Sequence, residues 1–399
     1  MFAVLLCIPA ILVTSGSYAG ATWFGIPVIY VLLGTLFVSY ACCFAMKWEA
    51  LSLRTDEKCL LALVGWGLIY VVLSFLKVNR VFDADLAYET SYIPRQAVYF
   101  AVFPAAILFR ENLYLKMVER FLKRYGEILF WALYIYHMYY FQDFTLTVIA
   151  QILLCWLSLH LETNQRWRRW LRIIALVVLP LPDYGELTIL IVRAIFLAIC
   201  VVPKQWSRTM LCLMAVVVFA VVVTCFILPQ VTDEGTFADA SMSWRMRIWK
   251  EEETILQNTH FIGAGYGTSY PSQTYAKEAV ARFEGQYRAE GGYTEYERMF
   301  VTAPHNSFMA LTMRTGIVGL LLFLAYLILL FRNLVRHKPL PPKSACFALF
   351  AGIILILFNV GLESPGYLLT FVFCIGVCAR AGKKLEDQDR ILLENGETA

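Results

Sequence analysis

The sequence predicts an all-α membrane protein that crosses the bilayer about twelve times and carries one large, partly helical loop on its outer side. Three observations lead to this prediction. Of the 399 residues, 59% are hydrophobic and 16% are charged, whereas soluble domains average about 25% charged residues. Apolar runs of roughly the 20 residues that a bilayer span needs recur along the chain. Basic residues gather in alternate loops, as they do on the inner side of membrane proteins.

The predicted spans form two groups, separated by the only long polar segment. We divide the chain into N-terminal transmembrane helices (1–229, about nine), the large outer loop (230–304), C-terminal transmembrane helices (305–380, about three) and an inner tail (381–399). The individual spans are expected near residues 2–15, 22–46, 59–76, 96–109, 127–141, 145–161, 171–182, 187–203, 209–229, 306–331, 345–361 and 367–379.

The first apolar run, 2–15, also resembles the start of a signal peptide, because it is short and Ser17-Tyr18-Ala19 follow it. It lacks the basic residues with which a signal peptide begins. We therefore expect a retained first helix.

Lys and Arg residues orient the chain. When the N-terminus is placed in the cytoplasm and the loops alternate, the short outer loops 142–144, 183–186 and 362–366 hold no basic residue. Both termini are then expected in the cytoplasm. The basic, amphipathic tract 110–126 is expected to lie along the inner membrane surface. The inner loops hold Arg110, Lys116, Arg120, Lys123, Arg124, Arg166, Arg168, Arg169, Arg172, Lys204, Arg208, Arg332, Arg336, Lys338, Lys343, Arg380, Lys383 and Lys384.

The large outer loop is expected to begin with a helix over about 244–258. Ser241 and Ser243 are candidate N-cap residues. One side of this helix is apolar, and Lys250 and Glu251–Glu253 are expected to face water.

A glycine-rich turn and a second amphipathic helix, near 273–289, are expected to follow. Gly263, Gly265 and Gly267 have the spacing of a backbone that turns sharply or lies close to a ligand. The loop is also rich in aromatic residues, Tyr266 and Tyr270 among them, which suit either an aromatic belt at the lipid surface or stacking on sugars.

Arginines near or inside the membrane are candidates for binding an anion. Arg193 and Arg314 lie within predicted spans, where a charge costs at least about 2.5–3.5 kcal/mol. Arg193 could pair with Glu186 on the same helix face, or it could bind phosphate oxygens through its guanidinium. No role is assigned to Arg314.

The outer loops hold three further arginines of interest. Arg245 shares a helix face with Trp249, so that stacking could aim its guanidinium. Arg247 lies on the same helix, and Arg95 ends the outer segment 77–95. Each of these residues would also be ordinary on a solvated surface.

His305 is the candidate for proton transfer. Pro304 precedes it, and Asn306 follows it and is able to cap the next helix. A neutral imidazole can take a proton from a hydroxyl group near neutral pH. The alternative is that these residues only begin a helix.

Other classes of site find little support in the sequence. The eleven cysteines lie in or beside apolar runs, so neither a disulfide framework nor a metal site is expected. The net charge of +4 is too small to suggest a nucleic-acid partner.

The polar residues of the loop follow a definite order. Arg245-x-x-x-Trp249 comes first, then Gly263-x-Gly-x-Gly267, then His305-Asn306 and a Gly316-x-x-Gly319 helix. This order resembles the O-antigen ligase and O-antigen polymerase superfamily of bacterial envelope glycosyltransferases. The span that contains Arg193 resembles the family's Ser-Arg-Gly helix, although Val192 and Ile195 depart from its pattern.

The resemblance implies a donor glycan carried on undecaprenyl diphosphate at the periplasmic face of the bacterial inner membrane. It implies that Arg193 and Arg245 hold the diphosphate and that His305 assists attack by an acceptor hydroxyl, on lipid A core or another glycan. The transfer would be inverting and would need no metal or other cofactor. Membrane lipids surround the enzyme. The further binding residues expected are Arg247, Arg95, Asn306 and Gly265.

Several functions remain open. Within the superfamily, the protein could be an O-antigen ligase or a repeat-unit polymerase of O-antigen or capsule. About twelve helices would also suit a transporter or flippase, but mid-membrane carboxylates for ion coupling and an internal repeat are not evident. A non-catalytic scaffold is a third possibility.

Overall fold

The computed structural model describes residues 22–23, 26–27, 53–78, 85–104, 106–107, 113–140, 144–161, 166–177, 187–201, 207–231, 240–277, 299–300, 305–336, 341–359 and 362–394. Over these residues the secondary structure is helical, apart from strands β1 (Thr22–Trp23) and β2 (Ile26–Pro27), which pair antiparallel. This confirms the helical fold class. The predicted first span, 2–15, and most of the second, 22–46, lie outside the described residues.

The described helices follow one another with short connections. They are α3 (Thr55–Phe75), the 3-10 turn η4 (Thr90–Tyr92), α4 (Ile93–Gln96), α5 (Val98–Val102), α7 (Leu113–Tyr140), α8 (Phe144–His160), α9 (Arg166–Val177), α10 (Leu187–Val201), α11 (Ser207–Val231), α12 (Ala240–Asn258), α15 (Ser307–Val335), α16 (Lys343–Phe358) and α17 (Pro365–Glu394).

Two described helices, α3 and α15, are long and apolar enough to cross a membrane. Four shorter apolar helical stretches coincide with predicted spans: Thr147–His160, Thr188–Val201, Leu211–Ala220 and Lys343–Phe358. The structure is therefore consistent with a helical membrane protein. The number of about twelve spans stays a prediction.

Three boundaries differ from the predicted ones. The span expected at 96–109 is broken, because α4 ends at Gln96 and α5 runs only from Val98 to Val102. Pro104 follows shortly, and its ring removes a backbone N–H that a continuing helix would use. The tract 110–126 and the next span share one helix, α7, and α17 continues past residue 380 to Glu394.

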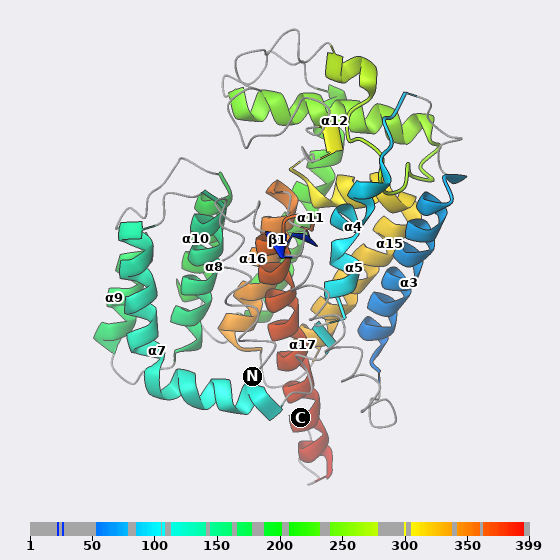
Figure 1. The fold of residues 1–399 in the computed structure, drawn as a ribbon. Coiled ribbons are helices and arrows are strands. Elements are labelled where there is room, and N and C mark those ends of the chain that lie inside the picture. Colours follow the sequence, from blue (N-terminus) through cyan, green and yellow to red (C-terminus); the bar gives the residue numbers. More distant parts are fainter. Residues whose placement is uncertain are drawn as a thin grey trace.

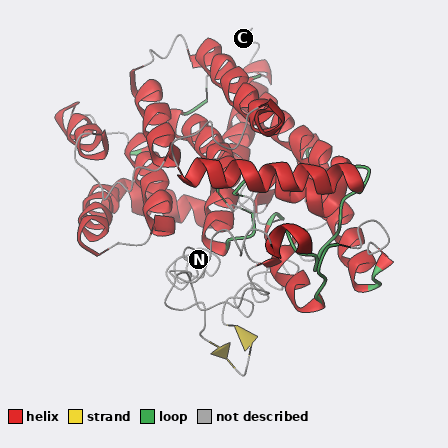
Figure 2. Ribbon diagram, turned by 90° about the horizontal axis from the view of Figure 1, so that it is seen from above, coloured by secondary structure: helices red, strands yellow, loops and turns green. Residues whose placement is uncertain are grey.

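Helices α15 and α16 form the centre of the packing. α15 packs along α3 and also contacts α17 and α12, while α16 packs against α17, α10 and α8. Nearly every side chain of α16 is buried. Figure 1 shows these helices running side by side as a bundle, with α12 lying across one end of it. The view from above shows α12 crossing the ends of the bundle helices (Figure 2).

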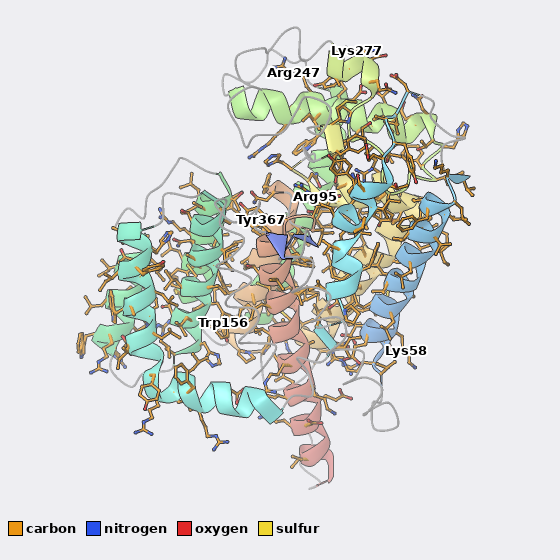
Figure 3. The ribbon with its side chains drawn as sticks, in the orientation of Figure 1. Lys58, Arg95, Trp156, Arg247, Lys277 and Tyr367 are labelled. Carbon is orange, nitrogen blue, oxygen red and sulfur yellow. The ribbon has the colours of Figure 1, made fainter. Side chains whose placement is uncertain are left out.

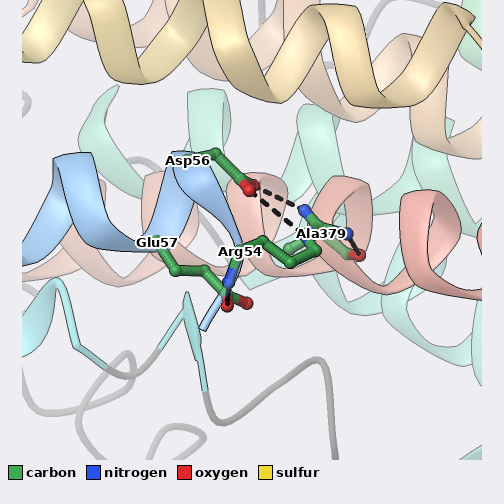
Figure 4. A network of polar contacts seen from close by, with 4 residues as sticks. All are labelled: Arg54, Asp56, Glu57 and Ala379. Carbon is green, nitrogen blue, oxygen red and sulfur yellow. Dashed lines mark hydrogen bonds and ion pairs between the residues drawn. The ribbon is translucent and has the colours of Figure 1, made fainter. Parts of the chain in front are cut away.

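The opposite end of the bundle is tied by ion pairs. The guanidinium of Arg54, just before α3, donates to Asp56 and to the carbonyl oxygen of Ala379 on α17, and its backbone N–H donates to Glu57 (Figure 4). Glu119 of α7 accepts from both Arg380 (3.0 Å) and Lys384 (2.7 Å) of α17. Figure 1 shows the first part of α7 lying across this end.

Segments predicted on one side of the membrane meet each other in the structure. Residues expected inside, such as Arg54, Glu119 and Arg380, cluster at one end. At the other end the two predicted outer segments pair, with Tyr88 bridged to Thr268. The assignment of these ends to cytoplasm and periplasm stays a prediction.

Candidate active site

The start of α15 has the cap that the sequence predicts. The Oδ1 atom of Asn306 accepts hydrogen bonds from the backbone N–H groups of Phe308 (3.0 Å) and Met309 (3.3 Å). These bonds satisfy two of the N–H groups that a helix leaves unpaired in its first turn. The Nδ2 atom of Asn306 is buried and donates to no described residue, so this half of the amide keeps its hydrogen-bonding capacity.

His305 stands directly before this cap in a strained conformation. Its φ of 51° lies in the left-handed region, which non-glycine residues occupy at a cost of about 1–3 kcal/mol. Burial lowers the pKa of His305 to about 4, and the positive charge of Arg245 contributes to the same shift. The imidazole is therefore neutral at pH values near neutrality and lies close to a guanidinium.

Arg245 reaches this position from the bundle-facing side of α12. Arg245, Trp249 and Glu252 project from one face of the helix, because they are separated by about one turn each, and their exposed fractions are 7%, 0% and 0%. The prediction that Glu252 faces water is therefore wrong. α12 also begins at Ala240, so that Ser241 and Ser243 lie inside the helix and are not its N-caps.

The glycine-rich turn packs against α15. Gly263, Gly265 and Gly267 have φ values of 97°, 79° and 78°, all in the region that favours glycine. Gly263 faces Gly316, where α15 is kinked with φ 70° and ψ −176°. A Cβ atom on Gly316 would come within 2.1 Å of the carbonyl oxygen of Ile262. The glycines thus permit a close approach of the turn to a helix.

Backbone hydrogen bonds and Arg314 fasten the turn in this place. The N–H of Ala264 donates to the carbonyl of Met313 (2.6 Å), and the N–H of Ile317 donates to Phe261 (2.9 Å). The Nη1 atom of Arg314 donates to the carbonyl oxygens of Gly265 (3.2 Å) and Thr268 (3.0 Å). Gly265, predicted to bind substrate, therefore uses its carbonyl oxygen within the fold.

Arg314 is completely buried, and the sequence gave no indication of its role. Its guanidinium lies 4.1 Å from the centre of the Tyr270 ring, within the range of a cation–π contact. Tyr266 and Tyr270 are themselves fully buried. These two rings therefore belong to the interior of the protein, and neither the lipid belt nor sugar stacking applies to them.

Arg95 and Arg247 approach the same region from different elements. Figure 3 shows Arg247 on α12 and Arg95 below it, at the upper end of α4. The residue after Arg95, Gln96, accepts a hydrogen bond from the N–H of Gly267 (2.7 Å) and donates to the carbonyl of Thr268 (3.1 Å). The glycine-rich turn is therefore bonded to α4 as well as to α15.

Arg193 lies on α10, whose start is joined to α15 by a buried polar chain. Asn359 donates to the hydroxyl of Thr188 on α10 (3.2 Å), and Ser307 of α15 donates to the carbonyl of Asn359 (3.2 Å). Arg193 is about 7.5 Å further along the helix axis than Thr188. Its recorded electrostatic neighbours include His137 on α7. The predicted partner Glu186 lies outside the described residues.

Two buried glutamates belong to this region and were not predicted. Glu252 and Glu363 have exposed fractions of 0% and 9%. Burial raises the pKa of Glu252 well above its usual range, with Arg314 opposing the rise. Burial also raises the pKa of Glu363 to about 8, and Arg95 opposes that rise. A glutamate seven residues after Arg245 is two helical turns away, and this spacing could have indicated the burial of Glu252.

The described residues contain no group of three or more His, Cys, Asp or Glu side chains that could hold a metal ion. The polar groups gathered at the outer end are instead arginines, one histidine and isolated carboxyl groups. Such a set suits an anionic ligand with a hydroxyl-bearing partner.

Comparison with known families identifies the segment that carries these residues. Residues 185–324 match the family described as O-antigen ligase, whereas the search of curated proteins gave no match. The matched segment extends from just before α10 into α15, and so includes Arg193, Arg245, the glycine-rich turn and His305. The chain therefore carries a domain of the O-antigen ligase family, as the order of its loop residues predicts.

Proposed function

We propose that the protein is a membrane glycosyltransferase that moves a glycan from undecaprenyl diphosphate to an acceptor hydroxyl on lipid A core. The reaction takes place at the periplasmic face of the bacterial inner membrane, inverts the anomeric centre and needs no metal. The observation that carries the proposal is the pair formed by His305 and Arg245. A neutral imidazole and a guanidinium meet where the loop enters α15, inside the segment that matches the O-antigen ligase family.

His305 acts on the acceptor. Its neutral imidazole takes the proton of the acceptor hydroxyl while the oxygen bonds to the anomeric carbon of the donor sugar. The bond between that carbon and the diphosphate oxygen breaks, and its electron pair leaves with undecaprenyl diphosphate. The same arginine that lowers the pKa of His305 would be neutralised by a bound diphosphate. Donor binding therefore makes His305 a stronger base when the reaction needs one.

The arginines act on the leaving group. Negative charge grows on the diphosphate oxygen as the glycosyl bond breaks, and fixed guanidinium groups stabilise it most strongly where water is scarce. Arg245 is buried beside His305, which supports its role as the principal clamp. Arg193, Arg247 and Arg95 complete the anion site, with the Nδ2 of Asn306 as a further donor. Holding donor and acceptor together lowers the remaining barrier.

The proposal is tested with membranes supplied with a lipid-linked oligosaccharide and purified lipid A core. His305→Ala and Arg245→Ala are each expected to lower transfer at least about 100-fold, as the loss of a general base or a charge-stabilising donor does. His260→Ala and Lys250→Ala are the matched controls, because both side chains are exposed on the same loop. Full activity in both site variants, at normal protein levels, would refute the mechanism and favour a transporter or scaffold.

A deletion strain separates a ligase from a repeat-unit polymerase. Loss of a ligase leaves long polymer on the lipid carrier and none on the core. Loss of a polymerase leaves core capped with a single repeat unit. The first pattern is the one we expect, and unchanged envelope glycans would contradict both activities.

A further inference from the structure

The turn between α16 and α17 is held against the start of α15. The hydroxyl of Ser307, two residues after His305, donates to the carbonyl oxygen of Asn359 (3.2 Å) and accepts from the N–H of Leu362 (3.1 Å). Both bonds are buried. They fix the backbone that leads into Glu363, so this carboxyl group is carried at the same end of α15 as His305.

Glu363 is more than nine-tenths buried, and its hydrogen-bonding capacity is not used within the fold. Its Oε1 atom is out of contact with solvent and accepts no hydrogen bond from any described residue. A buried polar atom without a partner costs about 1–3 kcal/mol. An atom of this kind in a native structure calls for a ligand, an ordered water or a chemical role.

The surroundings of Glu363 narrow the choice of ligand. The charged and titratable groups that act on it are Arg95 of α4, Tyr99 of α5, Tyr266 of the glycine-rich turn and Glu252 of α12. A carboxyl group repels a phosphate, whereas Arg95 opposes a bound cation. A neutral group that both donates and accepts hydrogen bonds fits this environment, and the hydroxyl groups of a sugar are of this type.

Glu252 provides a second, independent sign of the same kind. Neither of its carboxyl oxygens accepts a hydrogen bond from a described residue, although the side chain is fully buried. Arg314 affects it electrostatically, while the Nε and Nη2 atoms of Arg314 also lack an acceptor among the described residues. Facing polar groups without a direct bond are typical of a water-filled space between them. The interior behind Glu363 is therefore polar and hydrated.

We propose that Glu363 binds hydroxyl groups of a saccharide held beside His305, so that it belongs to the sugar site and not to the diphosphate site. This inference rests on the proposed function and adds the residue that recognises the sugar. Because burial raises the pKa of Glu363 to about 8, its carboxyl group is mainly protonated at neutral pH. In that form it donates one hydrogen bond and accepts others, as a side-chain amide does.

The test compares Glu363→Gln with Glu363→Leu in purified enzyme reconstituted into vesicles. The Gln variant keeps a donor and an acceptor, so KM for both substrates should stay within about threefold of wild type. The Leu variant should raise KM for the substrate whose sugar contacts Glu363 by about tenfold or more, with a smaller change in kcat. A rise in KM for the donor or for lipid A core identifies which saccharide is bound. Glu253→Leu, on the other side of α12, is the control.

Equal KM values for wild type and the Leu variant, for both substrates, would overturn the inference. Thermal unfolding of each purified variant separates a binding defect from a folding defect, and Glu363→Met replaces the Leu variant if that protein does not fold. The two proposals fail differently. If His305→Ala and Arg245→Ala abolish transfer while Glu363→Leu binds both substrates normally, only the sugar site is refuted. If the first two variants keep full activity, the proposed function itself fails.

Discussion

The two ends of the helical bundle treat buried charge in opposite ways. At the inner end, carboxylates and cations are bonded directly: Asp56 accepts two hydrogen bonds from Arg54, and Glu119 lies 3.0 Å from Arg380. At the outer end, Glu252 and Glu363 are buried without a hydrogen bond to any described residue. The inner end uses charge to join helices, while the outer end keeps polar groups available.

This contrast distinguishes structure from function in chemical terms. A charge pair at hydrogen-bond distance has its requirements met and needs no ligand. A buried carboxyl group with unused oxygens destabilises the fold, so its presence is explained by what it binds. The strained backbone of His305 lies at the same end and supports the same interpretation.

The largest expected effect comes from separating the outer loop from the bundle. Gly316→Ala would place a Cβ atom 2.1 Å from the carbonyl oxygen of Ile262, at a φ of 70°. We expect a loss of about 3 kcal/mol in stability, because a strained backbone and a steric clash combine, and a loss of transfer activity. Thermal unfolding and the transfer assay measure both effects.

Gly65→Ala is the control for this substitution. Gly65 lies inside α3, and nothing stands within 4 Å of the position where a Cβ atom would be. Alanine favours a helix over glycine by about 1 kcal/mol, so this variant should be as stable as wild type or more stable. If Gly316→Ala behaved in the same way, the close packing of the turn on α15 would be wrong.

A smaller effect is expected at the inner end. Asp56→Asn removes the charge that two hydrogen bonds from Arg54 meet, and should lower the free energy of unfolding by about 2 kcal/mol. Transfer per folded molecule should not change, because Asp56 lies at the end remote from His305. A variant of normal stability with a large defect in transfer would contradict the assignment of structural and functional ends.

The sequence predicts one kind of feature in this site well. The cap at Asn306, the position of His305 and the face of α12 that carries Arg245 all follow from local rules of helix formation. The short range of these rules is the reason for their success. The ends of α12 and of α17 were misplaced by several residues, since helix boundaries depend on packing as well as on local preference.

Features that depend on contacts between distant segments were missed. Arg314 acts on carbonyl groups 46 and 49 residues away in the chain, and no local pattern indicates such a contact. Glu363 lies in a short polar turn that the sequence assigns to water, and it is buried because Ser307 holds that turn on α15. Burial of a polar residue is a property of the assembled helices, so the sequence predicts its chemistry but not its environment.

The smallest expected effects are pH dependences of stability, which have opposite signs for the two titratable groups of the outer end. His305 has a pKa of about 4 in the folded protein, below its unfolded value of about 6.5. The unfolded chain therefore binds more protons between these values, and stability from this group falls as pH decreases from about 6.5 to 4. Glu363, with a folded pKa of about 8, keeps its proton longer than the unfolded chain does, so its contribution falls as pH rises from about 4.5 to 8.

Single variants separate these opposing contributions. Between pH values of about 5 and 7, each group should change the free energy of unfolding by on the order of 2 kcal/mol. Relative to wild type, His305→Ala should lose stability more steeply as pH rises across this window, because only the Glu363 contribution remains of the two. Glu363→Gln should change in the opposite direction. Thermal unfolding of the three proteins at both pH values measures the differences, and parallel pH profiles would mean that neither side chain is buried as the outer end requires.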